Sequence, residues 1–147
     1  MYYREVSIHI DAPAEKVFDY VTDVARHGEW AANELVIRRD PGPDHGPGAR
    51  FTSQVKLMGE ITAHGVVIEE DRPERFIYEV EDSSGKWRWT MALQRQAQGT
   101  LLSHRFERIR APLWVLLIQT WLLYPFVGRP AMQKGLANIK AQVESEA

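Results

Sequence analysis

The sequence predicts an α+β domain in which a curved antiparallel sheet of seven strands wraps around a long C-terminal helix. Three observations lead to this prediction. Residues 35–109 hold successive segments of alternating apolar and polar residues joined by short turns, which is typical of antiparallel strands. Residues 130–145 repeat apolar side chains at steps of three and four, as an amphipathic helix does. Residues 113–126 are almost continuously apolar, so other parts of the chain must cover them.

Composition narrows the class of protein. A chain of 147 residues has the size of one domain with a single core. Its net charge is −2 and no basic stripe exists, which argues against nucleic acid as the main partner. The absence of cysteine excludes disulfides and thiolate sites. The N-terminus has no apolar signal-peptide core, so we expect a cytoplasmic protein.

One strand and two short helices are expected at the start of the chain. Apolar residues alternate with polar ones over residues 6–10, the period of a strand with one buried face. A helix then begins near Pro13, which suits a first turn, and Glu15 favours its positive end. A second short helix covers residues 24–27, and Gly28 ends it.

Six further strands follow, interrupted by turn sequences rich in Gly, Pro, Asp and Ser. They are expected over residues 35–39, 50–57, 61–70, 75–81, 86–94 and 100–109.

The strand over residues 61–70 has two alternative facings. In one, the odd-numbered residues point inward, namely Ile61, Ala63, Gly65 and Val67. In the other, the even-numbered residues do so, namely Thr62, His64, Val66 and Ile68. A bulge at Gly65 would make both partly true.

The C-terminal stretch predicts two helices, over residues 113–124 and 130–145. Pro125 would break the first helix, Gly128 would permit a turn, and Pro130 suits the first turn of the second. The apolar stripe of the second helix, extended backwards, meets further apolar side chains, so one buried face could run through both. These side chains are Trp121, Leu117 and Trp114.

Residues 113–126 also raise the question of a membrane span. Crossing a bilayer takes about 20 consecutive apolar residues. The run here is shorter, contains Gln119 and Thr120, and is flanked by Arg110 and Arg129. We therefore expect a buried or cavity-lining helix. Because its apolar surface exceeds what one groove covers, we also expect a homodimer or a weak membrane-surface contact through residues 113–126.

The order of these elements and several local strings resemble a known family. The strings are IDAPAEKVFD (10–19), VTDVARHGEW (21–30), GARF (48–51) and GT (99–100), together with residues 136–144. On these residues the chain resembles the START-like (SRPBCC) superfamily, and within it the polyketide cyclase/dehydrase and lipid-transport group. The resemblance implies the helix-grip fold in a single domain over residues 1–147. It implies no particular reaction, because the superfamily includes carriers, receptors and cyclases.

The resemblance further implies a cavity between the sheet and the C-terminal helix. Pockets for such ligands are mostly apolar with a few polar groups, although the same side chains would also serve as ordinary core. The candidate ligand-binding residues are Trp30, Phe51, Ser53, His64, Phe76, Tyr78, Trp87, Trp89, His104, Phe106, Leu117, Trp121 and Tyr124.

Two functional hypotheses follow. The leading one is a carrier or sensor that binds a hydrophobic small molecule such as a lipid, quinone or polyketide. The alternative is a cyclase/dehydratase-type enzyme in which His104 and Tyr78 pass protons and Arg50, if a bulge turned it inward, steadies an enolate. His104 could equally be a core residue bonded to a hydroxyl such as that of Tyr78.

The remaining histidines suggest no chemistry. His9 falls on an outward face, while His27 and His45 fall in expected loops, and we assign none of them a role. The histidines show no metal-ligand spacing, so neither a metal site nor a cofactor is expected.

Overall fold

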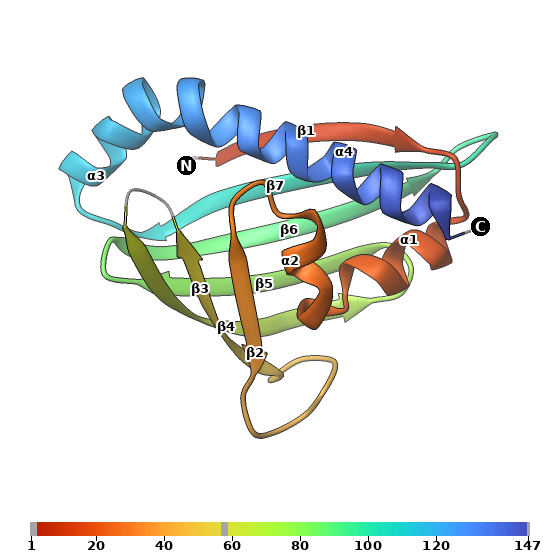
Figure 1. The fold of residues 1–147 in the computed structure, drawn as a ribbon, viewed down its shortest axis with the longest axis horizontal. Coiled ribbons are helices and arrows are strands. Elements are labelled where there is room, and N and C mark those ends of the chain that lie inside the picture. Colours follow the sequence, from red (N-terminus) through yellow and green to blue (C-terminus); the bar gives the residue numbers. More distant parts are fainter. Residues whose placement is uncertain (1–2, 57–58, 147) are drawn as a thin grey trace.

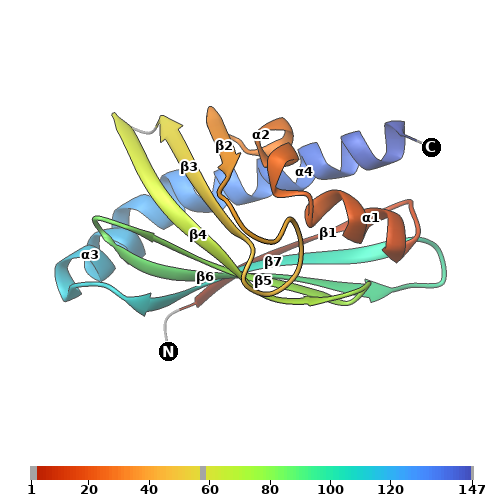
Figure 2. The same ribbon diagram turned by 90° about the horizontal axis from the view of Figure 1, so that it is seen from below.

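The computed structural model describes residues 3–56 and 59–146 and has two layers, a twisted sheet and a long helical segment lying across it (Figures 1 and 2). The sheet has seven antiparallel strands in the order β1-β7-β6-β5-β4-β3-β2. The strands are β1 (Tyr3–Ile10), β2 (Leu35–Arg39), β3 (Arg50–Lys56), β4 (Glu60–Asp71), β5 (Arg75–Asp82), β6 (Gly85–Arg95) and β7 (Thr100–Arg110). The predicted α+β fold, with its seven-stranded antiparallel sheet and long C-terminal helix, is confirmed. The predicted strand over residues 50–57 ends at Leu57, which lies outside the described residues.

Helices occur in two places. The first group follows β1 and comprises α1 (Ala14–Val21), the 3-10 turn η1 (Val24–Arg26) and the single turn α2 (His27–Trp30). The prediction that Gly28 ends the second short helix is wrong, because Gly28 lies inside α2. A side chain there would place its Cβ 2.6 Å from the carbonyl oxygen of Leu35, so glycine is needed for a close approach to β2.

The C-terminal segment is one continuous run of helix. It comprises α3 (Leu113–Ile118), the π-helical segment η2 (Gln119–Gly128) and α4 (Arg129–Ser145). The predicted break at Pro125 is therefore wrong. A π-helical turn is wider than an α-turn and shifts its hydrogen bonds to i→i+5, and Pro125, which has no N–H to give, lies within it. None of the helices in the described part of the chain has the length and apolarity of a bilayer crossing.

The core lies where α4 packs into the concave face of the sheet. Its buried stripe is the predicted one, formed by Met132, Leu136, Ile139 and Val143. The stripe does not continue backwards, because no residue of α3 or η2 is buried. The wider π-turn changes the angular position of each residue, so the predicted extension of the buried face is wrong.

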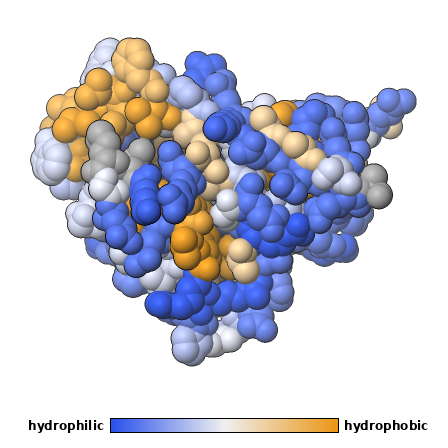
Figure 3. Space-filling view, in the orientation of Figure 1, coloured by the Kyte–Doolittle hydropathy of each residue, from blue (hydrophilic) through white to orange (hydrophobic). Residues whose placement is uncertain are grey.

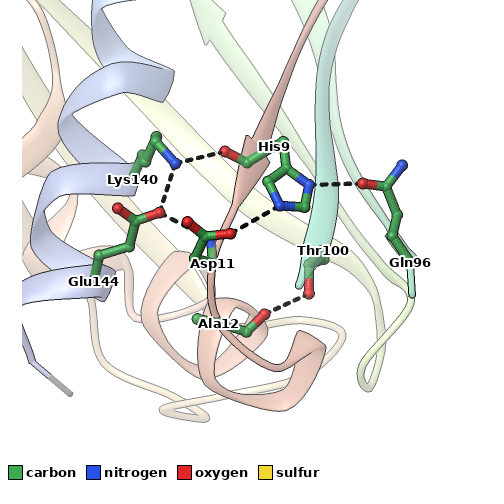
Figure 4. Close-up of polar contacts among 7 residues, drawn as sticks. All are labelled: His9, Asp11, Ala12, Gln96, Thr100, Lys140 and Glu144. Carbon is green, nitrogen blue, oxygen red and sulfur yellow. Dashed lines mark hydrogen bonds and ion pairs between the residues drawn. The ribbon is translucent and has the colours of Figure 1, made fainter. Parts of the chain in front are cut away.

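A polar network holds the C-terminal end of α4 against β1 (Figure 4). The ammonium group of Lys140 donates to the carbonyl of His9 at 3.0 Å and pairs with Glu144 at 2.6 Å. The Glu144 carboxylate also accepts from the backbone N–H of Asp11 at 2.8 Å. Beside it, the hydroxyl of Thr100 donates to the carbonyl of Ala12 at 2.8 Å. The last two turns of α4 are thus hydrogen-bonded to the end of β1 and to the residue that follows it.

Packing on β3 decides the facing of β4. Ala63, Gly65 and Val67 are buried, so the odd-numbered residues point inward. The bulge lies between Val67 and Glu69 and not at Gly65. A Cβ at Gly65 would lie 2.2 Å from the ring of Phe51, so this glycine makes room for the aromatic side chain of the neighbouring strand.

Candidate functional site

Inward-facing aromatic side chains form a continuous row across the concave face of the sheet. They come from alternate positions of β3, β5, β6 and β7, because successive residues of a strand point to opposite faces. Tyr78 lies at the centre, with its ring 5.9 Å from Phe51, 5.2 Å from Phe76 and 6.5 Å from Trp89. Phe106 continues the row, 5.3 Å from Trp89. The aromatic residues of the strands that were expected to share one interior do so.

Two ring nitrogens are buried in this interior without a hydrogen-bond partner among the described residues. They are Nε1 of Trp30 and Nε2 of His104. Trp30 ends α2 and His104 lies on β7, and their rings meet edge to face at 6.0 Å. An unsatisfied buried polar group costs about 1–3 kcal/mol, so such a pair in a folded protein calls for an explanation.

His27 joins this site although its sequence position suggested a loop. It opens α2, is only 3% exposed, and lies 4.9 Å from Trp30 and 5.9 Å from Tyr78, ring to ring. Its Nε2–H donates to the carbonyl of Val21 at 2.8 Å. The one available signal was its place three residues before Trp30, which puts the two rings on the same side of a helical turn.

Burial keeps the titratable groups of the interior uncharged. It lowers the pKa of His104 to about 3, and repulsion from His27 acts in the same direction. Burial also lowers the pKa of His27 to about 4, although the hydrogen bond to the carbonyl of Val21 acts in the opposite direction. Burial raises the pKa of the Tyr78 phenol. At neutral pH both imidazoles are therefore neutral and the phenol keeps its proton.

The proposed proton-passing pair is not in contact. His104 lies on β7 and Tyr78 on β5, and the indole of Trp89 on β6 lies between them, 4.9 Å from the imidazole. The suggested hydrogen bond between His104 and a core hydroxyl is absent among the described residues, since Nε2 is unpartnered. Arg50 is exposed at the start of β3, so no bulge turns it inward.

The other candidates divide between the interior and the surface. Ser53 is buried on the inner face of β3. Trp87 and Tyr124 are half-buried, and their rings lie 5.9 and 6.0 Å from Phe106. The placement of the other three candidates inside is wrong. His64 is exposed on the outer face beside Thr52, and Leu117 and Trp121 are 51% and 76% exposed.

Two hollows at the surface lie outside the space between the sheet and α4. One, of about 450 Å³, lies where the start of α1 meets the start of β5 and the end of β6. Pro73 and Leu93 form part of its wall. The other, of about 370 Å³, lies at the β5–β6 turn beside Arg110. The aromatic row lies where the cavity was expected, and Trp87, Trp89 and Tyr124 are half-buried beside it. Within residues 3–56 and 59–146, no three His, Asp or Glu side chains gather as metal ligands.

Comparison with known proteins agrees with this architecture. The family described as polyketide cyclase / dehydrase and lipid transport matches residues 4–144. Protein TTHA0849 from Thermus thermophilus has 15% identity and a TM-score of 0.79, with 99% of each chain covered. Protein CV1439 from Chromobacterium violaceum has 20% identity and a TM-score of 0.73, covering 98% of this chain and 99% of that one.

A third solved structure is a protein with two domains. It is the di-domain ARO/CYC StfQ from the steffimycin biosynthetic pathway, with 12% identity and a TM-score of 0.78. The match covers 98% of this chain and 51% of StfQ, so this chain corresponds to about half of that protein. No curated protein matches the chain.

Proposed function

The chain belongs to the polyketide cyclase / dehydrase and lipid transport family, and from this premise we propose that it binds a hydrophobic molecule that carries a carbonyl or hydroxyl oxygen. The ligand lies in the aromatic interior between the sheet and the C-terminal helical segment, and the protein acts as its carrier or sensor.

The observation that supports this proposal is the pair of unpartnered ring nitrogens on Trp30 and His104. An indole N–H only donates, whereas a neutral imidazole nitrogen donates or accepts according to its tautomer. A ligand oxygen with two lone pairs accepts from Trp30, and a ligand hydroxyl also donates to His104. The surrounding rings offer flat apolar contact, as pockets for such molecules do.

The half-buried end of the aromatic row provides the entrance. Trp87 and Trp89 are partly exposed there, and Tyr124 of η2 packs against the same end of the row through Phe106. Because α3 and η2 contain half-buried residues but no buried ones, displacing this part of the helix exposes less apolar surface than displacing α4 would. Room for a ligand is then gained without disrupting α4.

The geometry favours binding over acid–base catalysis. A general acid and base must both reach the reacting atoms, and the indole of Trp89 separates Tyr78 from His104. The low pKa of His104, about 3, also makes its imidazole a poor proton acceptor at neutral pH. Its neutral ring is suited to hydrogen bonding with a ligand oxygen.

A pair of flat tricyclic probes tests the role of Trp30. Fluorenone carries a carbonyl oxygen and fluorene has the same rings without it. We expect Trp30→Phe to lower the ratio of fluorenone to fluorene affinity by about 3- to 10-fold, the worth of one net hydrogen bond. Isothermal titration calorimetry measures both affinities, and Trp114→Phe, at a position 65% exposed, is the matched control. An unchanged ratio in Trp30→Phe would contradict the proposal, as would a failure of wild-type protein to bind either probe.

A further inference from the structure

One end of the molecule carries a large apolar surface formed by α3 and η2. In Figure 3 it is the continuous orange area over the end of the molecule where Figure 1 labels α3. We name it the apolar patch. Its members are the exposed residues Leu113, Trp114, Leu117, Ile118, Trp121, Leu122, Phe126 and Val127, with exposed fractions from 38% to 76%.

The apolar patch is not the outer side of an ordinary surface helix. An amphipathic helix buries its apolar stripe, whereas α3 and η2 bury no residue at all. Trp114 and Trp121 are 65% and 76% exposed, although large aromatic side chains gain most from burial. Contiguous exposed apolar surface of this kind marks contact with a partner or a membrane.

The charges around the apolar patch have one sign. Residues 108–143 contain no aspartate or glutamate, although the whole chain has a net charge of −2. Among the described residues Arg129 and Lys134, both exposed at the start of α4, form no ion pair, and neither does Arg108 at the end of β7. Arg110 pairs with Glu81 on β5. The segment that carries the apolar patch is therefore basic.

We propose that the apolar patch docks the protein on the surface of a membrane that contains anionic phospholipids. Tryptophan and phenylalanine side chains settle at the boundary between headgroups and acyl chains, and neighbouring cations are attracted to anionic headgroups. A second copy of the chain is a poorer occupant. A two-fold interface buries the same surface on both copies, so it would gather the unpaired cations of both copies around one interface.

The shape of the segment agrees with shallow insertion. The exposed residues recur as adjacent pairs every four positions along α3 and η2, and the pairs between them are half-buried. The exposed pairs are Leu113–Trp114, Leu117–Ile118, Trp121–Leu122 and Pro125–Phe126. They therefore form one outward strip along the helix, which can lie in the plane of a bilayer surface with its apolar side chains inserted.

Sedimentation with vesicles tests this docking in the full chain. We expect binding to vesicles of equal parts phosphatidylcholine and phosphatidylserine, and much weaker binding to phosphatidylcholine alone. Trp121→Ala is expected to weaken binding by about tenfold through lost insertion. Arg129→Gln is expected to weaken it by about fivefold, the contribution of one cation near an anionic surface.

Exposed positions away from the apolar patch serve as matched controls. Val36, 61% exposed on β2, and Arg38, whose side chain is 77% exposed, lie elsewhere on the sheet. Val36→Ala and Arg38→Gln should leave vesicle binding unchanged.

The proposal is overturned if wild-type protein binds neither vesicle, or if Trp121→Ala binds as well as wild type. Concentration-dependent dimers that Trp121→Ala abolishes, without vesicle binding, would overturn it in favour of a second copy. None of these outcomes bears on the fluorenone test, which probes the interior.

Discussion

Replacing Leu136 by alanine is expected to lower the free energy of unfolding by about 2–5 kcal/mol. Leu136 is 1% exposed and lies in the middle of the buried α4 stripe. Truncation removes its apolar contacts and leaves a cavity, because the surrounding side chains are held by their own packing and cannot collapse fully. Urea denaturation monitored by circular dichroism measures the change.

The same substitution elsewhere in the same helical segment provides the control. Leu122 in η2 is 59% exposed, and Leu122→Ala is expected to change the free energy of unfolding by less than about 0.5 kcal/mol. Equal losses in the two variants would show that η2 is packed in solution as tightly as α4, contrary to the structure.

Acidification from pH 7.5 to pH 5 is expected to lower the free energy of unfolding by about 4 kcal/mol. Burial lowers the pKa of His27 to about 4 and of His104 to about 3, whereas both titrate near 6.5 in the unfolded chain. The unfolded state therefore binds more protons than the folded state below pH 6.5. Stability is fully present above that value, and it is lost as the pH falls towards the folded pKa values.

A variant separates the two histidines. His104→Phe keeps a ring of similar size and removes one titrating group, so its loss of stability between pH 7.5 and pH 5 is expected to fall to about 2 kcal/mol. Denaturant titrations at pH 7.5, 6.0 and 5.0 measure the slopes. A slope in His104→Phe equal to that of the wild type would mean that His104 is protonated in the folded protein and is not buried as described.

Elements with a strong local period could be predicted from the sequence. The alternation around Trp87 and Trp89 identifies β6, and the three–four spacing of Leu136 and Ile139 identifies the buried stripe of α4. In both cases the pattern follows directly from which side of the element meets the core. The facing of β4 could not be decided in this way, because it depends on the ring of Phe51 lying over Gly65 in the neighbouring strand.

The parts of the candidate site that were missed depend on tertiary arrangement. Burial of His27 results from the packing of α2 under the helical segment, where Asn138 donates to the carbonyl of Trp30 at 3.0 Å. The exposure of Trp121 results from the extension of α3 and η2 beyond the part of the helix that meets the core. The spacing of Trp121 relative to α4 is helical, but the spacing does not reveal where the neighbouring layer stops.

A helix that buries side chains in only one of its halves has unequal local stability along its length. The run from Leu113 to Ser145 is joined to β1 through Lys140 and Glu144 and is packed through its last four turns, whereas its first four turns bury no side chain. Free energies of local opening follow the number of buried contacts, so backbone amides in α4 are protected from hydrogen exchange by the cooperativity of the whole domain. Amides in α3 and η2 open independently of it. The apolar end of this helix can therefore change its surroundings while the rest of the domain stays folded.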